Sequence, residues 1–386
     1  MISNSTFKII LLLLLGLMGL TAARIGAPEL LGVDAVSADY MIFHQVGELA
    51  NEGRAALAYD AAGFKAHQAA RTGSEVFMTW TYPPQFNLLT QLLALFPVWL
   101  GYLLFTGVSF AFFVWAVLGL GPAGRTAIML VLPAIAINLL TGQNGFLTGG
   151  MMALVARFAL AQAPTKAGIT LGLLAYKPHL GLGLGLAALL RGGVRLVVVA
   201  CLTLAASLLL VTLIYGSGIW AAFQASIAQS SSLLEAGQYK LVRMSTVFAF
   251  LASLGLNSGA ALSVHMAGAL VALGAVAYAS FRGWPLKHVL ALGMISGAAL
   301  SPYAYDYDLC LLAPAIALIW PDLTLKPAQR ALLAAAILLT TGFGLLTVIF
   351  SDPLKQLTFE LPALGGLGLI IMFTLMFAGL ARTNQA

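Results

Sequence analysis

Acidic residues are unevenly distributed along this chain of 386 residues. Seven of its 13 carboxylates lie within residues 24–75, and none lies within residues 76–234. Proton transfer by a carboxylate must therefore rely mainly on the first of these stretches. Glu235 and the pair Asp306 and Asp308 are the main later competitors for such a role.

Two of the early acids, Asp34 and Asp39, closely follow the apolar run of residues 7–23. If that run enters a membrane, both lie near the membrane surface, where a general base must sit to act on a lipid-attached substrate. Asp39 also opens a segment in which Tyr40, Phe43 and further apolar residues recur at helical spacing. This spacing predicts an amphipathic helix along the surface up to about residue 53. The ordinary alternative is that both acids are solvated loop carboxylates without a chemical role.

Lys177 is the most unusual cation, because residues 176–179 interrupt an otherwise apolar stretch. A lysine in such a stretch costs roughly 3 kcal/mol to insert into a membrane and usually faces a cavity or a partner. We therefore expect Lys177 to bind a phosphate group. Its neighbour His179 and, as second choice, Arg243 at the end of a later polar segment are expected to contribute. A lysine at the outer surface that meets only lipid head groups would give the same pattern.

Other polar residues suited to sugar hydroxyls interrupt the apolar runs at residues 82, 141–145 and 301–308. A helix-to-helix turn uses the same glycine and carboxamide residues as the second of these segments, and tyrosines are common anchors at membrane interfaces. The candidates for binding a sugar or its acceptor are Gln143, Asn144, Tyr82, Tyr305, Asp306 and Asp308.

The composition requires that these residues be held by membrane-spanning elements. The chain is 61% hydrophobic and 8% charged, with a mean hydropathy of +0.97, whereas soluble domains carry about 25% charged residues. The apolar runs lack the alternation of a membrane β-barrel, so they predict an all-α polytopic protein of about 12 spans, with 11–14 allowed. The runs are residues 7–23, 98–120, 127–140, 146–163, 194–215, 260–281, 289–300, 309–320, 331–350 and 361–380.

The basic residues predict the orientation. The net charge of +6 arises largely from lysines and arginines in short connections, which can all be cytoplasmic if both termini are inside. This charge therefore does not indicate a nucleic-acid partner. A cleavable signal peptide is an alternative interpretation of the first run. The two cysteines, Cys201 and Cys310, lie in separate apolar runs and imply no disulfide or metal framework.

This topology divides a single membrane domain, residues 1–386, into three parts. Residues 24–81 form a large extracytoplasmic loop that carries the candidate base and the amphipathic helix. Residues 82–320 form the helical core, and residues 321–386 add the C-terminal helices. Within the core, Gly145 and Gly149, like Gly181 and Gly185, have the four-residue spacing typical of close helix packing.

The order of the polar motifs resembles that of bacterial glycosyltransferase family 87, polytopic enzymes of the GT-C fold class that use polyprenyl-phosphate sugars and include α-mannosyltransferases. The likeness covers most of the chain but not the last two spans, and no single motif is decisive. The matching pieces are Asp39-Tyr40 with Phe43-His44, Ala58-Tyr59-Asp60, Trp80 to Pro84, Gly142 to Thr148, Tyr176-Lys177-Pro178, Met244 to Phe248, and Ser301-Pro302-Tyr303 with Tyr307-Asp308.

The resemblance implies transfer of a hexose, mannose first, from a polyprenyl phosphate to a lipid or glycan hydroxyl on the outer face of the inner membrane. It assigns the general base to Asp39, with Asp34 as the fallback, and inversion at the anomeric carbon follows. No cofactor is expected, and metal dependence stays open because Tyr40, not a second acid, follows Asp39.

Two other functions fit part of the sequence. A transporter or flippase for a lipid-linked sugar or other anion would use Lys177 as a substrate site inside the membrane. A catalytically silent assembly subunit is a third possibility. The enzyme hypothesis makes a spatial prediction: Asp39 and Lys177 must face one common chamber on the outer side.

Overall fold

The computed structural model describes residues 3–31, 39–72, 77–235, 239–350 and 361–385. These residues form helices joined by short connections, and within them the β-structure is limited to one isolated antiparallel bridge between Met244 and Tyr305. The predicted all-α class is therefore confirmed for this part of the chain. Asp34 lies outside the described residues.

The helix bounds are as follows. The first half of the chain contains α1 (Asn4–Gly26), α2 (Asp39–Asn51), α3 (Ala61–Thr72), α4 (Gln85–Leu93), α5 (Val98–Leu118), α6 (Gly124–Leu130), α7 (Leu132–Thr141), α8 (Gly145–Leu160), α9 (Pro164–Leu173) and α10 (Pro178–Arg191). The second half contains α11 (Val194–Tyr215), α12 (Gly218–Glu235), α13 (Val247–Ser253), α14 (Ser258–Phe281), α15 (Leu286–Leu300), α16 (Leu312–Ile319), α17 (Pro327–Ile349) and α19 (Gly365–Thr383). Short 3-10 helices are η1 (Pro28–Leu31), η2 (Ala55–Tyr59), η3 (Leu174–Tyr176), η4 (Leu241–Arg243), η5 (Asp306–Leu311) and η6 (Trp320–Asp322).

Long apolar helices match the predicted runs most closely. Among the described residues, six helices are long and apolar enough to cross a membrane: α1, α5, α11, α14, α17 and α19. The pair α6 and α7, bent by 64°, would add a seventh. The runs at residues 146–163 and 289–300 correspond to the shorter helices α8 and α15. A multi-pass membrane protein is thus supported, and the count of 12 spans stays a prediction.

Prolines explain two breaks in the helical core. Pro133 lies in the first turn of α7, where α6 ends and the direction of the chain changes. Pro178 is the first residue of α10, and the preceding Lys177 has φ −139° and ψ 64°, outside the helical region. Helical geometry is sterically disfavoured for a residue before proline, and Lys177 lies at a junction between helices.

The amphipathic helix predicted after Asp39 is present as α2, and most of its residues are buried within the protein. Tyr40, Phe43 and Val46 are at most 1% exposed, and even His44 and Gln45 are buried. At Gly47 a side chain would collide with the carbonyl group of Thr90 in α4. Helix α4 and the first loop cover α2, and its place along the membrane surface stays a prediction.

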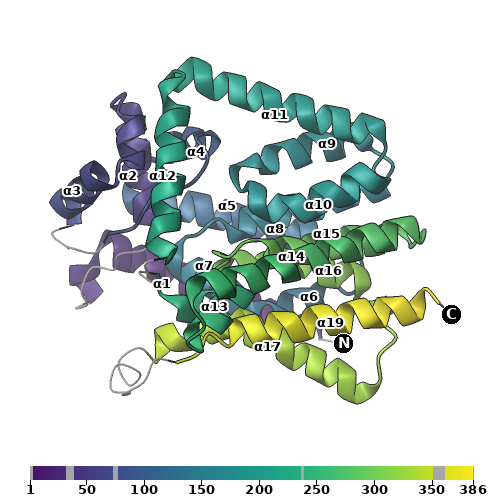
Figure 1. The fold of residues 1–386 in the computed structure, drawn as a ribbon. Coiled ribbons are helices and arrows are strands. Elements are labelled where there is room, and N and C mark those ends of the chain that lie inside the picture. The colour runs from purple at the N-terminus through teal and green to yellow at the C-terminus, as the bar shows by residue number, and fades with distance from the viewer. Residues whose placement is uncertain (1–2, 32–38, 73–76, 236–238, 351–360, 386) are drawn as a thin grey trace.

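Helix α4 packs against both α2 and α5. Its nine residues span only about 14 Å, which is too short to cross a hydrocarbon layer of about 30 Å. A helix of this length fits a re-entrant segment better than a tilted membrane span. Figure 1 places α2, α3 and α12 at one end of the bundle and both termini at the other.

Glycines allow the closest helix contacts. Gly145 and Gly149 lie directly against the carbonyl groups of Tyr307 and Cys310 in η5, as their spacing predicted. The second predicted pair does not make such contacts: a side chain at Gly181 or Gly185 would meet little or nothing. Between α10 and α15, Gly183 instead packs against the backbone of the facing helix. The spacing identified a small-residue face but not the residue that the neighbouring helix approaches.

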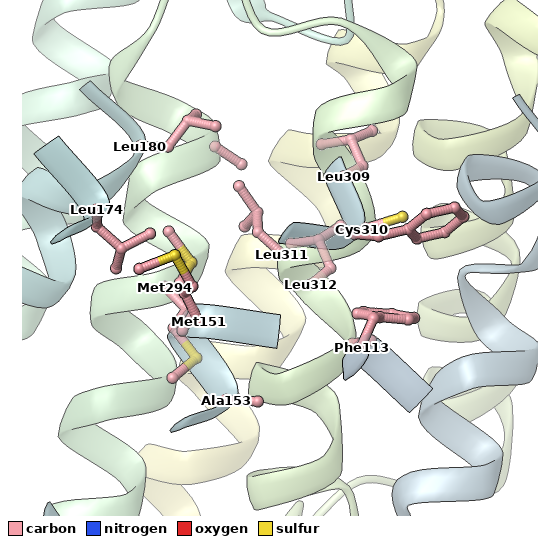
Figure 2. Packing of buried hydrophobic residues seen from close by; sticks show 14 of the residues in the cluster. Phe113, Met151, Ala153, Leu174, Leu180, Met294, Leu309, Cys310, Leu311 and Leu312 are labelled. Carbon is pink, nitrogen blue, oxygen red and sulfur yellow. The ribbon is translucent and has the colours of Figure 1, made fainter. Parts of the chain in front are cut away.

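The centre of the core lies around η5. Figure 2 shows Leu309, Cys310, Leu311 and Leu312 surrounded by Phe113 of α5, Met151 of α8, Leu180 of α10 and Met294 of α15. All four residues of this segment are fully buried. The apolar end of η5 is thereby fixed in the core, and this fixes the position of its polar start, Asp306 to Asp308.

Candidate active site

Asp39, the first residue of α2, faces the turn between α7 and α8. Gln143 Nε2 donates a hydrogen bond to Asp39 Oδ2 at 2.9 Å, and the Tyr82 hydroxyl donates to Gln143 Oε1 at 3.0 Å. The turn depends on Gly142, whose φ of 68° lies in the left-handed region that favours glycine. A side chain there would also collide with Tyr40. Asp39, Gln143 and Tyr82 thus form one hydrogen-bonded group.

Lys177 is buried beside this group. The residue is 5% exposed, so the alternative of a surface lysine that meets only lipid head groups does not describe it. Its ammonium donates to Asn144 Oδ1 at 2.7 Å and forms an ion pair with Asp308. Asp308 Oδ2 in turn accepts a hydrogen bond from the backbone amide of Tyr305 at 3.1 Å. The break between η3 and α10 at residue 177 therefore places a cation against η5.

Arg243 forms the second cation–carboxylate pair. Its Nε and Nη2 atoms donate to the two oxygens of Asp306 at 3.2 and 2.9 Å. This is the bidentate geometry in which a guanidinium binds a carboxylate most specifically. Asp306 Oδ1 also accepts from the backbone amide of Tyr307 at 2.9 Å. Both acids of the 305–308 turn are therefore occupied by a cation and by a backbone amide.

Tyr307 joins the two pairs. The Lys177 ammonium lies 5.3 Å from the centre of its ring, and the Arg243 guanidinium lies 6.0 Å from it. Lys177 also lies 5.4 Å from the Tyr82 ring, while Tyr305 stacks on Tyr307 with centroids 5.4 Å apart. Aromatic faces attract cations at these distances. The site is thus one cluster, with aromatic rings between its charges.

The cluster has an outer and an inner layer. Asp39, Tyr82 and Arg243 are partly exposed, and the Arg243 side chain is 20% exposed. Asn144 is completely buried, and Asp308 is 2% exposed. A ligand that approaches from outside therefore meets Asp39 and Arg243 before it meets the Lys177–Asp308 pair.

Burial raises the pKa of Asp39 above its ordinary value. The hydrogen bond from Gln143 and the positive charges of Arg243 and Lys177 act in the opposite direction but do not cancel the effect of burial. A carboxylate that holds its proton more tightly is a stronger base, so this environment favours proton abstraction near neutral pH. The same two cations can stabilise a negative charge that develops nearby.

Three further acids of the first loop, Glu48, Glu52 and Asp60, have structural partners. Glu48 forms an ion pair with Arg71, and Glu52 pairs with a neighbouring arginine at the surface. Asp60 accepts a hydrogen bond from the backbone amide of Gly63 at 3.2 Å and so caps the start of α3. These contacts set them apart from Asp39, whose partner is the side chain of Gln143.

Most of the predicted site residues meet in this cluster: Asp39, Tyr82, Gln143, Asn144, Lys177, Arg243, Tyr305, Asp306 and Asp308. His179 lies near enough for its charge to interact with those of Lys177 and Asp308, yet within the described residues it has no hydrogen bond to either. Asp34 cannot be placed, and the side chain of Glu235 is likewise outside the described part. The predicted roles of all these residues remain predictions.

Two residues of the cluster were missed. Tyr307 was interpreted as an interfacial anchor, although its place between two acids could have drawn attention to it. Asn138 of α7 was not considered; it is fully buried and donates to the carbonyl oxygen of Tyr307 at 2.6 Å. A lone carboxamide in an apolar run is the one sequence signal for it. In the described ranges, no three His, Cys, Asp or Glu side chains cluster as metal ligands.

Comparison with known proteins gives a family but no individual relative. No curated protein and no solved structure matches the chain. The sequence model of glycosyltransferase family 87 matches residues 80–302, more than half of the chain. The matched segment contains Tyr82, Gln143, Asn144, Lys177 and Arg243, whereas Asp39 and the two acids of η5 lie outside it. Because this match extends over most of the helical core, the protein belongs to glycosyltransferase family 87.

Proposed function

We propose that this glycosyltransferase moves a hexose, with mannose as the first candidate, from a polyprenyl phosphate to a hydroxyl of a lipid or glycan acceptor. The reaction takes place on the outer face of the inner membrane, with both termini in the cytoplasm. The observation that carries the proposal is the short path of hydrogen bonds from Asp39 through Gln143 to Tyr82, next to two buried or half-buried cations. The choice of mannose and of the lipid donor rests on the family resemblance.

In this mechanism Asp39 takes the proton of the acceptor hydroxyl. The acceptor oxygen forms a bond to the anomeric carbon as the bond from that carbon to the phosphate oxygen breaks, which inverts the configuration. The lipid phosphate leaves with the electron pair. Gln143 holds the Asp39 carboxylate in place, and Tyr82 lines the acceptor side.

The leaving phosphate requires positive charge. The sequence favours Lys177 first and Arg243 second for this contact, whereas the exposure of the two side chains favours the reverse order. Arg243 is the more exposed, and within the described residues its Nη1 atom keeps no partner after Asp306 has taken Nε and Nη2. We assign the first contact with phosphate to Arg243. Lys177, occupied by Asn144 and Asp308, acts from the inner layer through its charge.

The test is sugar transfer by the purified protein in detergent. The donors are polyprenyl phosphates that carry mannose, glucose or arabinose, and the acceptor is a membrane lipid extract. A transporter would give no product in this assay, because transport requires two compartments. Asp39→Asn is expected to lower kcat by about 10²- to 10⁴-fold, the usual contribution of a general base, at normal expression. Parental rates in both Asp39→Asn and Asp34→Asn would show that the mechanism is wrong.

A further inference from the structure

Asn138 connects two segments of the site that are far apart in the sequence. Its Oδ1 atom accepts a hydrogen bond from the backbone amide of Gly145 at 3.0 Å. Its Nδ2 atom donates to the carbonyl oxygen of Tyr307 at 2.6 Å and to that of Ala134 in its own helix at 2.9 Å. The amide of this fully buried side chain therefore has partners on both of its polar atoms.

The two segments that Asn138 joins carry the chemistry of the cluster. Gly145 directly follows Gln143 and Asn144, which bind Asp39 and Lys177. The Tyr307 carbonyl lies between the two acids that hold the cations, one residue from each. Asn138 is therefore a buried link between the segment of Gln143 and Asn144 and the segment of Asp306 and Asp308, in addition to Lys177, which bonds Asn144 and Asp308.

Gly145 lies at the same contact between α8 and η5 that Asn138 bridges. An added Cβ at this position would collide with the Tyr307 carbonyl oxygen and would lie 2.7 Å from Asn138 Nδ2. The backbones of α8 and η5 are therefore in direct contact where Asn138 bonds to both. A longer side chain at Gly145 would separate the two segments that Asn138 holds together.

We infer that Asn138 is a positioning residue for the sugar-transfer site, which sets the placement of Asp39 and Gln143 relative to the Lys177–Asp308 and Arg243–Asp306 pairs. It touches neither Asp39 nor a cation, so it acts through Gly145 and Tyr307. The inference rests on the proposed function. Misplacement of reacting groups by about 1 Å lowers rates by about 10²-fold, so its signature is a loss in kcat.

The kinetic test compares Asn138→Ala and Gly145→Ala with the parent protein. Each is expected to lower kcat by about 10²-fold and to change the donor KM by less than about threefold, because the charges that bind the donor remain. The double variant is expected to be no more than about threefold slower than the slower single variant, because both changes disrupt one contact. If Asn138→Ala does not fold, Gly145→Ala decides the question.

Ser296→Ala is the matched control for loss of a buried hydrogen-bonding side chain. Its hydroxyl donates to the carbonyl oxygens of Ala272 and Leu292 at 3.0 and 2.8 Å, and the residue is fully buried in α15. It is expected to lower thermal stability in detergent but to leave kcat within about twofold of the parent. A kcat within threefold of the parent in Asn138→Ala and Gly145→Ala, or an equal loss in Ser296→Ala, overturns the inference.

A second measurement does not depend on activity. Cys310 is fully buried in η5, and its thiol lies 3.4 Å from Asn138 Nδ2. In a Cys201→Ser background, alkylation of Cys310 by N-ethylmaleimide is expected to be at least tenfold faster in Asn138→Ala and Gly145→Ala, but not in Ser296→Ala. If the parent protein transfers no sugar, the proposed function fails, and the labelling experiment alone tests the role of Asn138. Equal alkylation rates in all variants would overturn the inference that Asn138 positions η5.

Discussion

Asp39 differs from a typical loop aspartate in its surroundings. It is partly buried, it accepts a hydrogen bond from Gln143, and burial raises the pKa of its carboxyl group. In the proposed mechanism the carboxylate must be ionised before it can take a proton. The rate of transfer should therefore fall as the pH is lowered, and it should do so at a higher pH than for a solvated aspartate.

The pH profile of kcat/KM tests this environment. Replacement of Gln143 by Leu removes a hydrogen bond to the charged form, which is worth about 1.5–3 kcal/mol, or about 1 to 2 pH units. In Gln143→Leu, the fall of kcat/KM at low pH (the acid limb of the profile) should therefore occur at a pH higher by about that amount. Gln91→Leu, whose side chain binds Tyr215 outside the site, should leave it unchanged. If the acid limb of Gln143→Leu lies at the same pH as that of the parent protein, then the limb does not report the titration of Asp39.

Arg243 provides a second prediction for a single residue. Arg243→Gln should lower kcat/KM for the donor by about 10²-fold or more, and Arg243→Lys should recover only part of this. One ammonium cannot hold both oxygens of Asp306 and also present a fixed donor to a phosphate. The exposed Lys240, three residues earlier, offers the matched control, with Lys240→Gln expected within twofold of the parent. Steady-state kinetics with varied donor would contradict the assignment if Lys177→Gln impaired donor binding and Arg243→Gln did not.

At the scale of elements, the site is built at helix ends. Asp39 begins α2, Gln143 and Asn144 lie between α7 and α8, and Lys177 lies between η3 and α10. Such junctions arise where glycine or proline interrupts an apolar helix. Irregular backbone within a membrane protein is tolerated where protein or a water-filled cavity supplies its hydrogen bonds. At the turn between α7 and α8, Gln143 Oε1 and Asn138 Oδ1 accept hydrogen bonds from the backbone amides of Asn144 and Gly145.

The turn at Gly142 tests how strictly the elements place the site. An alanine there must adopt a left-handed φ, at a cost of roughly 1–2 kcal/mol, and its Cβ would lie 2.6 Å from Tyr40 Cβ. Gly142→Ala should therefore displace Gln143 from Asp39 and lower kcat at least tenfold. Gly283→Ala has a similar φ of 71° with open space around it, so kinetic assays should detect no change in that control. Equal effects of the two substitutions would argue against the steric explanation.

At the scale of the whole molecule, two ion pairs connect the middle of the chain to its last third. Lys177 and Asp308 are 131 residues apart, and Arg243 and Asp306 are 63 apart. Both pairs end on the 305–308 turn, whose continuation is held in the core (Figure 2). The packing of α8, α10 and α15 around this segment therefore decides where the charges of the site lie.

The Lys177–Asp308 pair gives a prediction for stability. Removal of one partner leaves a buried charge alone, which typically costs 3–5 kcal/mol, whereas replacement of both by apolar residues is often neutral. Asp308→Asn should thus lower the midpoint of thermal unfolding in detergent, and the double variant Lys177→Met with Asp308→Leu should restore it without activity. A double variant as unstable as Asp308→Asn would mean that other contacts dominate.

Several features of the fold and the site were predictable from the sequence because they depend on local properties. Hydropathy identified α1, α5, α11, α14, α17 and α19 to within a few residues, and the proline after Lys177 identified the break there. The sequence predicted α2 but not its burial against α4, since the pattern of one segment does not reveal which other segment packs on it. Asn138 was missed for a similar reason: its partners, Gly145 and Tyr307, belong to two other segments.

By itself, the sequence determined that the protein is a helical membrane protein, that seven of its acids lie within residues 24–75, and that polar residues interrupt its apolar runs. Each of these follows from the composition of a stretch of chain, which hydration and backbone sterics translate directly into structure. Only the tertiary structure decided that Asp308 pairs with Lys177, that Asp306 pairs with Arg243, and that Asp39 lies beside both. Such pairings depend on how closely packed helices fit together, and no single segment encodes its distant partner.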